Sequence, residues 1–448
     1  MIHHNFSTLI SAIRKEAHRL VPGESADYDK LLDLIGQRRF VLIGDASHGT
    51  REFYRERAVI TKRLIEEKDF NVVAVEADFP DAYRVNCFVH GAGSDADAEQ
   101  ALSGFQRFPA WMWNNTEVYD FAVWLRKYND SISDNSRKAA FYGLDIYSLH
   151  TSIDEVVNYL EKTDPEAAKR ARDRYSCFDR FGDDTQQYAY ATATGISEPC
   201  ADEVIQQMLE LNRRWASSDE NAQMGERESL FVAEQNARII VDAEEYYRTM
   251  FRSDVRSWNL RDRHMAETIA AIDRHMSENG SGSKMVVWAH NSHLGDARFT
   301  EMGRRGELNV GQLVREKYRE DAFLLGFTTF TGTVTAAQDW GEEGRKRAVR
   351  PALNGSVERI LHDAGIERFM VSLQDGEISR ELRIDLLERA IGVIYRPETE
   401  RHSHYFKAQL AGQFDAVIHI DETSALEPLN ITPGWDTGEV METFPTGM

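Results

Sequence analysis

The stretch that decides the fold is the run 41–50, Val-Leu-Ile-Gly-Asp-Ala-Ser-His-Gly-Thr. It starts with three branched apolar residues, which are typical of a buried strand, and Gly44 permits a tight exit from that strand. Thr50 is suited to cap the helix that the following residues predict. In an open α/β sheet such a strand-to-helix corner lies at the carboxyl edge, where ligands bind. We therefore expect Asp45 and His48 at that edge, although a plain turn with a polar rim is the alternative.

Polar side chains also follow other predicted strands. The apolar run Asn-Val-Val-Ala-Val-Glu-Ala-Asp carries Glu76 near its end, and the run Met-Val-Val-Trp-Ala-His-Asn-Ser-His ends with His290 and His293. Because the carboxyl ends of parallel strands meet at one edge of a sheet, we expect these three side chains to lie beside His48. The alternative is that each is a structural polar group that serves only its own turn.

Strand-like and helix-like segments alternate in the first and last thirds of the chain. Further apolar runs predict strands at 140–145, 322–327, 392–395 and 416–420, and residues 328–335 form either a hairpin or an extension of the preceding strand. Between residues 151 and 275 the strand signal fades and helical periodicity replaces it. We therefore predict an α/β fold with a mostly parallel central sheet flanked by helices. Residues 1–150 and 281–448 form this α/β core, and residues 151–280 form a helical insertion over the carboxyl edge of the strands.

The composition limits the classes of partner. The 448 residues carry a formal net charge of −21, which argues against nucleic acid and anionic membrane surfaces. No apolar run approaches the roughly 20 residues of a membrane-spanning helix, and the first residues lack the pattern of a signal peptide. The cysteines are scattered and odd in number, which indicates a reducing compartment and no disulfide framework; they are Cys87, Cys177 and Cys200. We expect a cytoplasmic protein.

The residue types at the predicted edge are suited to hydrolysis by activated water. Imidazole has an ordinary pKa near ~6.5 and takes a proton from water at neutral pH, so His48 is the candidate base. Glu76 is placed to fix the tautomer of that histidine or to hold the water. His290 and His293 are candidates to stabilise an oxyanion or to protonate the leaving alcohol. A nucleophilic Ser47 is disfavoured, because Gly44 lies one residue too far upstream for a Gly-x-Ser-x-Gly elbow, and its hydroxyl more simply bonds the turn.

A divalent metal is the competing explanation for the same residues. Histidines separated by two residues, with a further histidine and a carboxylate, are acceptable ligands for zinc or manganese. The sequence contains no His-Glu-x-x-His motif and no cysteine cluster that would support a metal site. It also contains no Gly-x-Gly-x-x-Gly or Walker motif, so a nucleotide cofactor is not expected.

The same motifs resemble the signature blocks of the erythromycin esterase family, which includes macrolide-lactone hydrolases and succinoglycan-biosynthesis-like proteins. The matching blocks are Gly-Asp-Ala-Ser-His-Gly-Thr-Arg-Glu-Phe, Val-Glu-Ala-Asp and Trp-Ala-His-Asn-Ser-His-Leu-Gly-Asp, and the likeness continues in Asn-Leu-Arg-Asp, Tyr-Arg-Pro-Glu and Phe-Asp-Ala-Val-Ile-His. The resemblance implies that His48 is the base that activates water, with Glu76, His290 and His293 as its partners, and that no metal is needed. One departure is Asp45, where the antibiotic-resistance members usually carry glutamate.

We therefore predict a carboxylic ester hydrolase that cleaves an ester or lactone by histidine-activated water without a covalent intermediate. The family implies a macrolide such as erythromycin as the substrate, with antibiotic resistance as the role. A metal-dependent hydrolase of another ester or amide is one alternative, and a non-catalytic binding or accessory protein of polysaccharide synthesis is another. Asp45, Arg55 and Arg261 are the candidate substrate-binding residues. Two further features stay open: the aromatic segment around Trp111 and Trp113 is either core or pocket wall, and the cluster at His402 and His404 has no assigned role.

Overall fold

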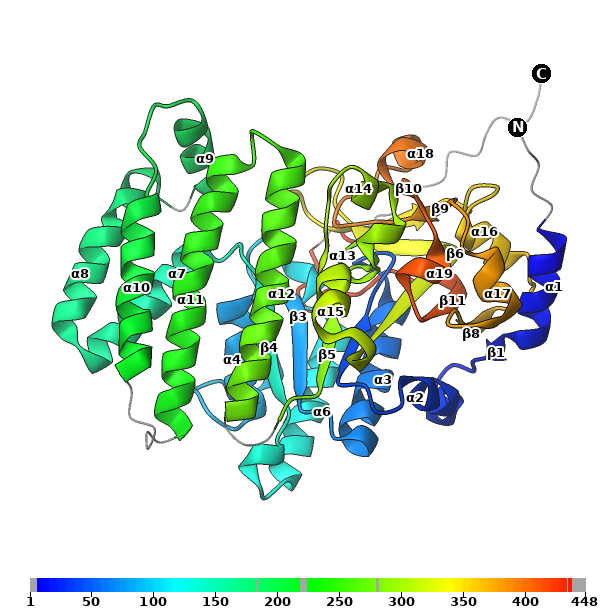
Figure 1. The fold of residues 1–448 in the computed structure, drawn as a ribbon, viewed down its shortest axis with the longest axis horizontal. Coiled ribbons are helices and arrows are strands. Elements are labelled where there is room, and N and C mark those ends of the chain that lie inside the picture. Colours follow the sequence, from blue (N-terminus) through cyan, green and yellow to red (C-terminus); the bar gives the residue numbers. More distant parts are fainter. Residues whose placement is uncertain (1–5, 183, 218–223, 279–281, 433, 437–448) are drawn as a thin grey trace.

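The computed structural model describes residues 6–182, 184–217, 224–278, 282–432 and 434–436. A nine-stranded mixed sheet runs through the middle of the molecule, in the order β1-β8-β11-β6-β2-β5-β3-β4, with β7 paired to β6 (Figure 1). Its strands are β1 (His18–Arg19), β2 (Phe40–Ile43), β3 (Val72–Asp78), β4 (Ala140–Asp145), β5 (Met285–Trp288), β6 (Ala322–Ala336), β7 (Arg345–Val349), β8 (Arg368–Ser372) and β11 (Ala416–Thr423). A separate antiparallel ribbon joins β9 (Leu386–Arg389) and β10 (Tyr405–Ala408).

The six central strands, from β11 to β4, are parallel, which confirms the predicted mostly parallel α/β sheet. β8 is antiparallel to β11 and β7 is antiparallel to β6. The register brings Ile43, Val75 and Trp288 level with one another across β2, β3 and β5. The residues that follow these three positions therefore lie at the same edge of the sheet, as the sequence predicts for His48, Glu76 and His290.

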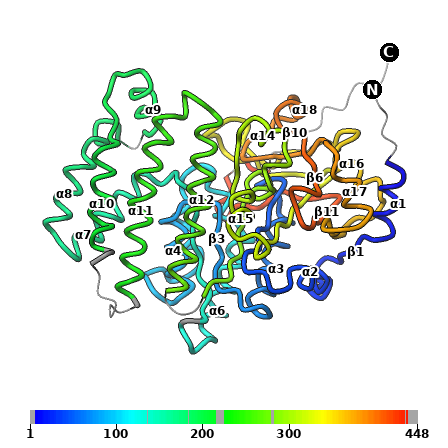
Figure 2. The backbone as a smooth tube through the Cα atoms, viewed as in Figure 1, coloured from blue at the N-terminus to red at the C-terminus, as the bar shows by residue number. Residues whose placement is uncertain are grey.

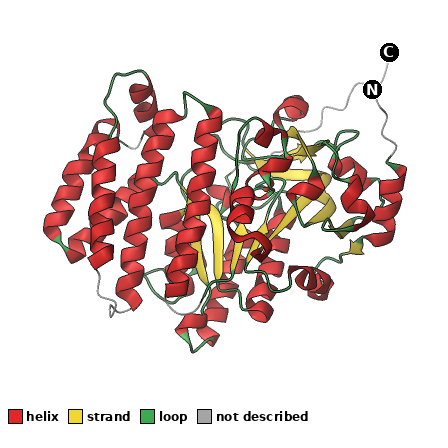
Figure 3. Ribbon diagram, viewed as in Figure 1, coloured by secondary structure: helices red, strands yellow, loops and turns green. Residues whose placement is uncertain are grey.

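Alternate residues of each strand enter two separate apolar layers, because successive side chains of a strand point to opposite faces. On one face Val41, Val73 and Val286 pack with α3, α4 and α6, and on the other Leu42 and Val287 pack with α1, α12 and α15. The layers make the strands apolar on both sides, as is usual for parallel sheets (Figure 3). The helices of the two layers are α1 (Ser7–Glu16), α3 (Arg51–Lys68), α4 (Phe79–Val89), α6 (Thr116–Ser131), α12 (Asp254–Glu278) and α15 (Val310–Tyr318).

The described residues between 149 and 278 are mostly helical, and most of them lie beyond β4 at one end of the molecule (Figure 1). It comprises α7 (Leu149–Thr163), α8 (Pro165–Tyr175), η4 (Ser176–Phe181), α9 (Thr185–Ala193), α10 (Ala201–Ser217), α11 (Met224–Thr249) and α12. α7 to α11 share an apolar cluster of their own, which includes Leu160, Leu211 and Ile240. Met265 and Ile269 of α12 instead join the core of the sheet, and Phe231 and Ile239 of α11 do so as well. The predicted insertion therefore contains an outer bundle, α7 to α11, and the helix α12, and both α11 and α12 pack against the sheet.

Shorter helices complete the core. They are α2 (Asp29–Ile35), α5 (Ala98–Leu102), η2 (Ala110–Met112), α13 (Asn291–Leu294), α14 (Glu301–Arg304), α16 (Val357–His362), α17 (Gly376–Glu381), α18 (Glu400–Ser403) and α19 (Leu410–Gln413). Figure 2 shows α1, from the start of the chain, beside α16 and α17, and β1 next to it pairs with β8. In the part of the chain that the structure describes, no helix is long and apolar enough to cross a membrane.

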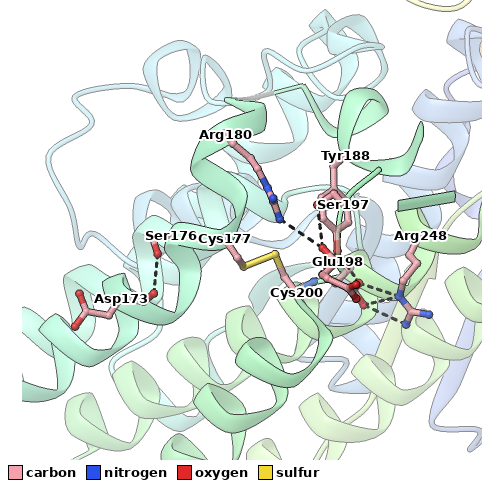
Figure 4. The surroundings of a disulfide bond; sticks show 10 residues. Asp173, Ser176, Cys177, Arg180, Tyr188, Ser197, Glu198, Cys200 and Arg248 are labelled. Atoms are coloured by element: carbon pink, nitrogen blue, oxygen red, sulfur yellow. Dashed lines mark hydrogen bonds and ion pairs between the residues drawn. A yellow bond between two sulfur atoms is a disulfide. The ribbon is translucent and has the colours of Figure 1, made fainter. Parts of the chain in front are cut away.

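Two sequence expectations are wrong. Residues 392–395 do not form a strand, because this segment makes only isolated bridges, such as that between Ala337 and Ile394. Cys177 and Cys200 form a disulfide between η4 and the start of α10, with their Cα atoms 6.0 Å apart (Figure 4). The pairing depends on how the outer bundle folds back on itself, which cysteine spacing does not reveal. The disulfide removes the cysteine argument for a reducing compartment, and the cytoplasmic location stays a prediction.

Candidate active site

His48 lies in the turn between β2 and α3 and is backed by a buried ion pair. Gly44 lets this turn approach the start of α13 closely, since a Cβ there would overlap the side chain of Asn291. Arg57 Nη1 donates to Asp45 Oδ2 over 2.8 Å, and Asp45 Oδ1 faces His48 Nδ1 at 3.5 Å. Burial favours the neutral acid, but Arg57 outweighs burial and lowers the pKa of Asp45. Asp45 is therefore a buried carboxylate aimed at the back of the His48 ring.

Glu76, at the end of β3, lies on the other side of His48. Its Oε1 is 3.9 Å from His48 Nε2 and accepts a 2.6 Å hydrogen bond from Arg261, while its Oε2 accepts from the backbone N–H of His290 at 2.9 Å. Burial raises the pKa of Glu76, but its interactions with His293 and Arg261 outweigh burial and hold the pKa well below its usual range. Glu76 is thus ionised, and both of its oxygens are fixed.

Arg261 reaches the strand ends from α12 and links three of them. Its Nε and Nη2 donate to the two oxygens of Asp145, at the end of β4, over 2.9 and 2.8 Å. Its Nη1 lies 3.0 Å from His293 Nε2, and its guanidinium lies over the ring of Tyr147 at 5.0 Å. Burial lowers the pKa of Arg261, but Asp145 and the other anionic neighbours outweigh it and raise the pKa well above its usual value. The guanidinium is therefore a permanent positive charge at the centre of the site.

His290 presents an N–H group to the site. The N–H of Ser292 donates to His290 Nδ1 at 3.2 Å and the Ser292 hydroxyl lies 2.7 Å from the same atom, so Nδ1 is an acceptor. In the neutral ring the proton then lies on Nε2, which is buried without a hydrogen-bond partner. Burial lowers the pKa of His290 to about 4, so the ring is neutral at physiological pH. The rings of His48 and His290 are 4.9 Å apart.

His293 is held from behind by Asp262 and from one face by Trp258. Its Nδ1 lies 2.9 Å from both oxygens of Asp262, and its ring stacks on Trp258 at 4.5 Å with an interplanar angle of 7°. Burial lowers the pKa of His293, but Asp262 and Glu76 outweigh burial and raise it. The contact with Arg261 requires an unprotonated Nε2, because a guanidinium only donates. A proton on His293 Nε2 would therefore favour a hydrogen bond to Glu76 Oε1, which lies 3.4 Å away, over the contact with Arg261.

These groups open onto a cavity of about 310 Å³. The cavity is lined by all four predicted catalytic residues and by Arg261, and aromatic and apolar side chains form much of the rest of its wall. These are Phe105, Met112, Trp113, Tyr147, Trp258 and Trp340. Trp113 also donates from Nε1 to the carbonyl of Glu76 over 2.9 Å, so the aromatic wall is tied to the catalytic strand end. The cavity size lies at the lower end of the ~300–1,000 Å³ that is usual for small-molecule sites.

The residues do not fit a divalent metal. In the part of the chain that the structure describes, no three His, Cys, Asp or Glu side chains are arranged to hold an ion. The guanidinium of Arg261 contacts both Glu76 and His293, the side chains that a metal would need as ligands. A fixed cation already supplies the positive charge there, and a second cation would be repelled.

Several predicted residues lie elsewhere. Arg55 pairs with Glu56 at 3.1 Å and is not among the residues that line the cavity, and Asp45 lies behind His48 without reaching the cavity wall. The hydroxyl of Ser47 bonds that of Thr50, which leaves Thr50 at the helix start without a side-chain cap. Trp111 is buried in the core and does not line the cavity, in contrast to Trp113.

The histidine cluster outside the cavity has a structural explanation. His404 is buried, accepts from the N–H of Arg396 at 3.1 Å, and has its pKa lowered by burial to about 4. His402 is exposed on α18. Neither residue lines the cavity.

Sequence reasoning did not assign roles to Arg57, Asp145, Trp258 or Asp262. Asp145 had a signal, because it ends a predicted strand as Glu76 does, and Asp262 belongs to the Asn-Leu-Arg-Asp motif. Arg57 had no distinctive signal: it is an arginine in an amphipathic helix, and only the structure shows it buried beneath the turn, with its guanidinium 4.3 Å from the Tyr54 ring.

Comparison with known proteins gives the family. The sequence profile of the erythromycin esterases matches residues 65–423. The chain belongs to the erythromycin esterase family. The matched range includes Glu76, Arg261 and both downstream histidines, whereas the turn that carries His48 precedes it.

The named relatives of this family member are distant but cover most of its length. An erythromycin esterase type II of Escherichia coli is 24% identical over 417 residues, which is 90% of this chain and 93% of that protein. A solved structure of a succinoglycan biosynthesis protein shares 20% identity with a TM-score of 0.73, covering 94% of this chain and 98% of the other. A histidine-to-asparagine mutant of the erythromycin esterase EreC, in its open conformation, gives 17% identity and a TM-score of 0.67 over 91% and 96%. These structural likenesses support the α/β fold, and the family indicates a hydrolase.

Proposed function

We propose that this protein hydrolyses an ester or lactone with water activated by His48, and that no covalent intermediate forms. The observation that carries the proposal is the arrangement around the open end of His48. His48 Nε2 lies 3.9 Å from Glu76 Oε1. The Nε2 of His290, which has no hydrogen-bond partner among the described residues, faces the same cavity, and all three residues line that cavity. A water molecule between these groups would have an acceptor for its proton and an anion to orient it.

Asp45 prepares His48 for this role. Asp45 Oδ1 and His48 Nδ1 are both buried without a hydrogen bond and face each other at 3.5 Å, so each is the natural partner of the other. A proton on Nδ1 leaves the lone pair of Nε2 toward the cavity. When His48 takes a proton from water, the carboxylate stabilises the imidazolium and the Nδ1–Oδ1 contact is expected to shorten.

His290 supplies the complementary group. Attack of hydroxide on the carbonyl carbon places negative charge on the carbonyl oxygen, and a fixed N–H donor stabilises that charge without reorganisation. The Nε2–H of His290 is such a donor, because its ring is neutral and its Nδ1 is occupied by Ser292. Collapse of the intermediate expels an alkoxide, which takes the proton held on His48 Nε2. The cycle then ends with the acid, the alcohol and a neutral His48.

The cavity wall supports a substrate with an apolar body. Aromatic and apolar side chains make up much of the surface around the catalytic end, as a lactone or aromatic ester requires. Membership of the erythromycin esterase family adds a macrolide lactone as the first substrate to try.

The experiment is a panel of small aryl esters, aliphatic lactones and a macrolide, assayed before and after chelation with EDTA. Rapid-quench samples of a slow ester are examined by intact-mass spectrometry, with Ser47→Ala as the comparison protein. We expect turnover that resists EDTA, no acylated protein and no loss in the Ser47 variant. An acyl adduct on a Ser47 peptide would contradict the direct-water mechanism, and binding without turnover across the panel would contradict the hydrolase.

A further inference from the structure

The carboxylates that line the cavity are not neutralised equally. Arg261 pairs with two of them, and Arg107 holds a third, Asp78, through hydrogen bonds of 2.7 and 3.0 Å. The fourth, Asp81, has no hydrogen bond or ion pair within the described part of the chain. The full set is Glu76, Asp78, Asp81 and Asp145.

The basic residues around Asp81 are already occupied. Arg84 gives its Nε and Nη2 to the two oxygens of Asp95, at 2.9 and 2.6 Å. Arg107 is held in the same two-pronged way by Asp78. A guanidinium that donates two hydrogen bonds to one carboxylate has little capacity left to pair with another carboxylate. Asp81 is therefore an uncompensated negative charge on the wall of a substrate cavity.

Asp81 occupies a different part of the wall from the catalytic histidines. It lies in the first turn of α4, and its Oδ1 is near the position that a Cβ of Gly104 would take, beside the cavity-lining Phe105. The charged groups that act most strongly on it come from the end of β3, α4, the segment before η2 and α7; they are Asp78, Arg84, Arg107 and Glu155. A group bound at Asp81 would therefore belong to a part of the substrate away from the scissile bond.

We propose that Asp81 is a specificity residue that pairs with a protonated amino group on the substrate. This inference rests on the proposed function, and it narrows the substrate class to amine-bearing esters or lactones. An ammonium group supplies the counter-charge that the wall lacks at this point, and Phe105 adds an aromatic surface next to it. The competing explanation is purely structural, because an acidic residue in the first turn of a helix favours the helix dipole.

The environment of Asp81 makes the pairing dependent on pH. Burial and the charge of Asp78 raise the pKa of Asp81 to about 7, against the opposing effects of Arg107 and Arg84, and Glu155 acts in the same direction as Asp78. Below this pH the carboxyl is neutral and attracts an ammonium weakly. Affinity for the amine is expected to rise as pH increases through 7, until the amine itself loses its proton. A residue that only stabilised α4 would produce no such difference between ligands.

The test uses two probes of the same shape. One is a phenyl ester with a dimethylaminomethyl arm, and the other carries an isobutyl arm in its place. Binding is followed by tryptophan fluorescence, because Trp113, Trp258 and Trp340 line the cavity, in a His48→Asn background that prevents turnover. The measurement therefore does not depend on whether the protein is an esterase, and hydrolysis of the same pair by the parent protein tests the proposed function separately.

We expect the parent background to bind the amine probe about tenfold more tightly than the isobutyl probe at pH 8, and to lose most of this preference at pH 6. Asp81→Asn removes the preference at both pH values. Glu155→Gln is the matched control, because it removes a nearby negative charge outside the cavity, and it keeps the preference. Equal affinity for the two probes in the parent background, or a preference that survives Asp81→Asn, overturns the proposal. Thermal unfolding of each variant checks that the fold is retained.

Discussion

Two regions contribute residues to the cavity in different ways: the ends of β2, β3 and β5, and the helices that follow β4. The parallel register of β2, β3 and β5 brings Glu76 and His290 to one edge of the sheet, and the turn after β2 adds His48. The helical region contributes Trp258 and Arg261, both from α12, which packs on the sheet. The outer bundle of α7 to α11 has its own apolar core. The comparison teaches that the insertion and the core build the cavity together, because α12 contributes both an aromatic wall residue and the guanidinium that pairs with Glu76.

The largest effect that tests this comparison is expected for Arg261→Met. The substitution leaves Glu76 and Asp145 as buried, unpaired carboxylates, and breaking a buried pair in this way costs roughly 3–5 kcal/mol of stability. The pKa of Glu76 should rise, and turnover should be lost on every substrate. Stability and kcat/KM are measured together.

Arg248→Met is the matched control for that variant, since it breaks an ion pair with the buried Glu244 inside the outer bundle. It should lower the unfolding temperature and leave turnover of a small ester unchanged. Equal catalytic losses in the two variants would show that the whole helical region, and not α12 alone, supports catalysis.

His290→Leu is expected to have the next largest effect. Removing one oxyanion donor lowers kcat by about 10²–10³. His290→Gln keeps an N–H donor near the same place and should recover part of the loss. Because burial keeps the pKa of His290 at about 4, the kcat profile of the parent should show no acid limb from this residue above pH 5. Leucine and glutamine variants with the same kcat would remove His290 from the oxyanion role.

Trp258→Ala tests how much α12 contributes to the selectivity between bulky and small substrates. The ring forms part of the cavity wall and stacks on His293, but it has no group that titrates near neutral pH and no charge. We expect a loss of about tenfold in kcat/KM for a bulky lactone, from the lost apolar contact, and a smaller loss for a small activated ester. Parallel kinetics on the two substrates give the answer. Equal losses on both would mean that Trp258 acts mainly by positioning His293.

The smallest effect on turnover is expected for Glu388→Gln, in the β9–β10 ribbon that belongs to neither region. Burial and the neighbouring Glu358 raise the pKa of Glu388 well above its usual value. The folded protein thus holds this carboxyl neutral. The stability that the neutral carboxyl contributes is present at low pH, and it is lost as the pH rises above the pKa of a glutamate in the unfolded chain, roughly 4.3. Glutamine should raise the unfolding temperature more at pH 8 than at pH 5 and leave turnover unchanged. A lower unfolding temperature at pH 8 would contradict this assignment.

The sequence predicted the strand ends well because they depend on local pattern. Apolar runs of the right length, each followed by a chemical side chain, located His48, Glu76, His290 and His293, and the parallel register brought them together. Asp45 and Arg55 were selected by the same nearness in sequence, but neither of them lines the cavity. A helix turns its residues by about 100° each, so Arg55 faces Glu56 and solvent while Arg57 faces the buried turn.

The remaining features depend on tertiary contacts that no local pattern encodes. Arg261 is separated from Glu76 by 185 residues, and only the packing of α12 on the sheet brings the two together. The Cys177–Cys200 disulfide likewise depends on the fold of the outer bundle. The uncompensated charge of Asp81 becomes visible only after each neighbouring arginine has been matched with its own carboxylate.

The most direct test of the account is the turnover of His48→Asn on a small activated aryl ester, measured beside its thermal unfolding. Asparagine keeps the size and polarity of the turn but cannot act as a base. The account predicts a loss of about 10²–10⁴ in kcat, with an unfolding temperature close to that of the parent. Turnover close to that of the parent in a folded His48→Asn protein would contradict the account, because another group would then have to activate the water.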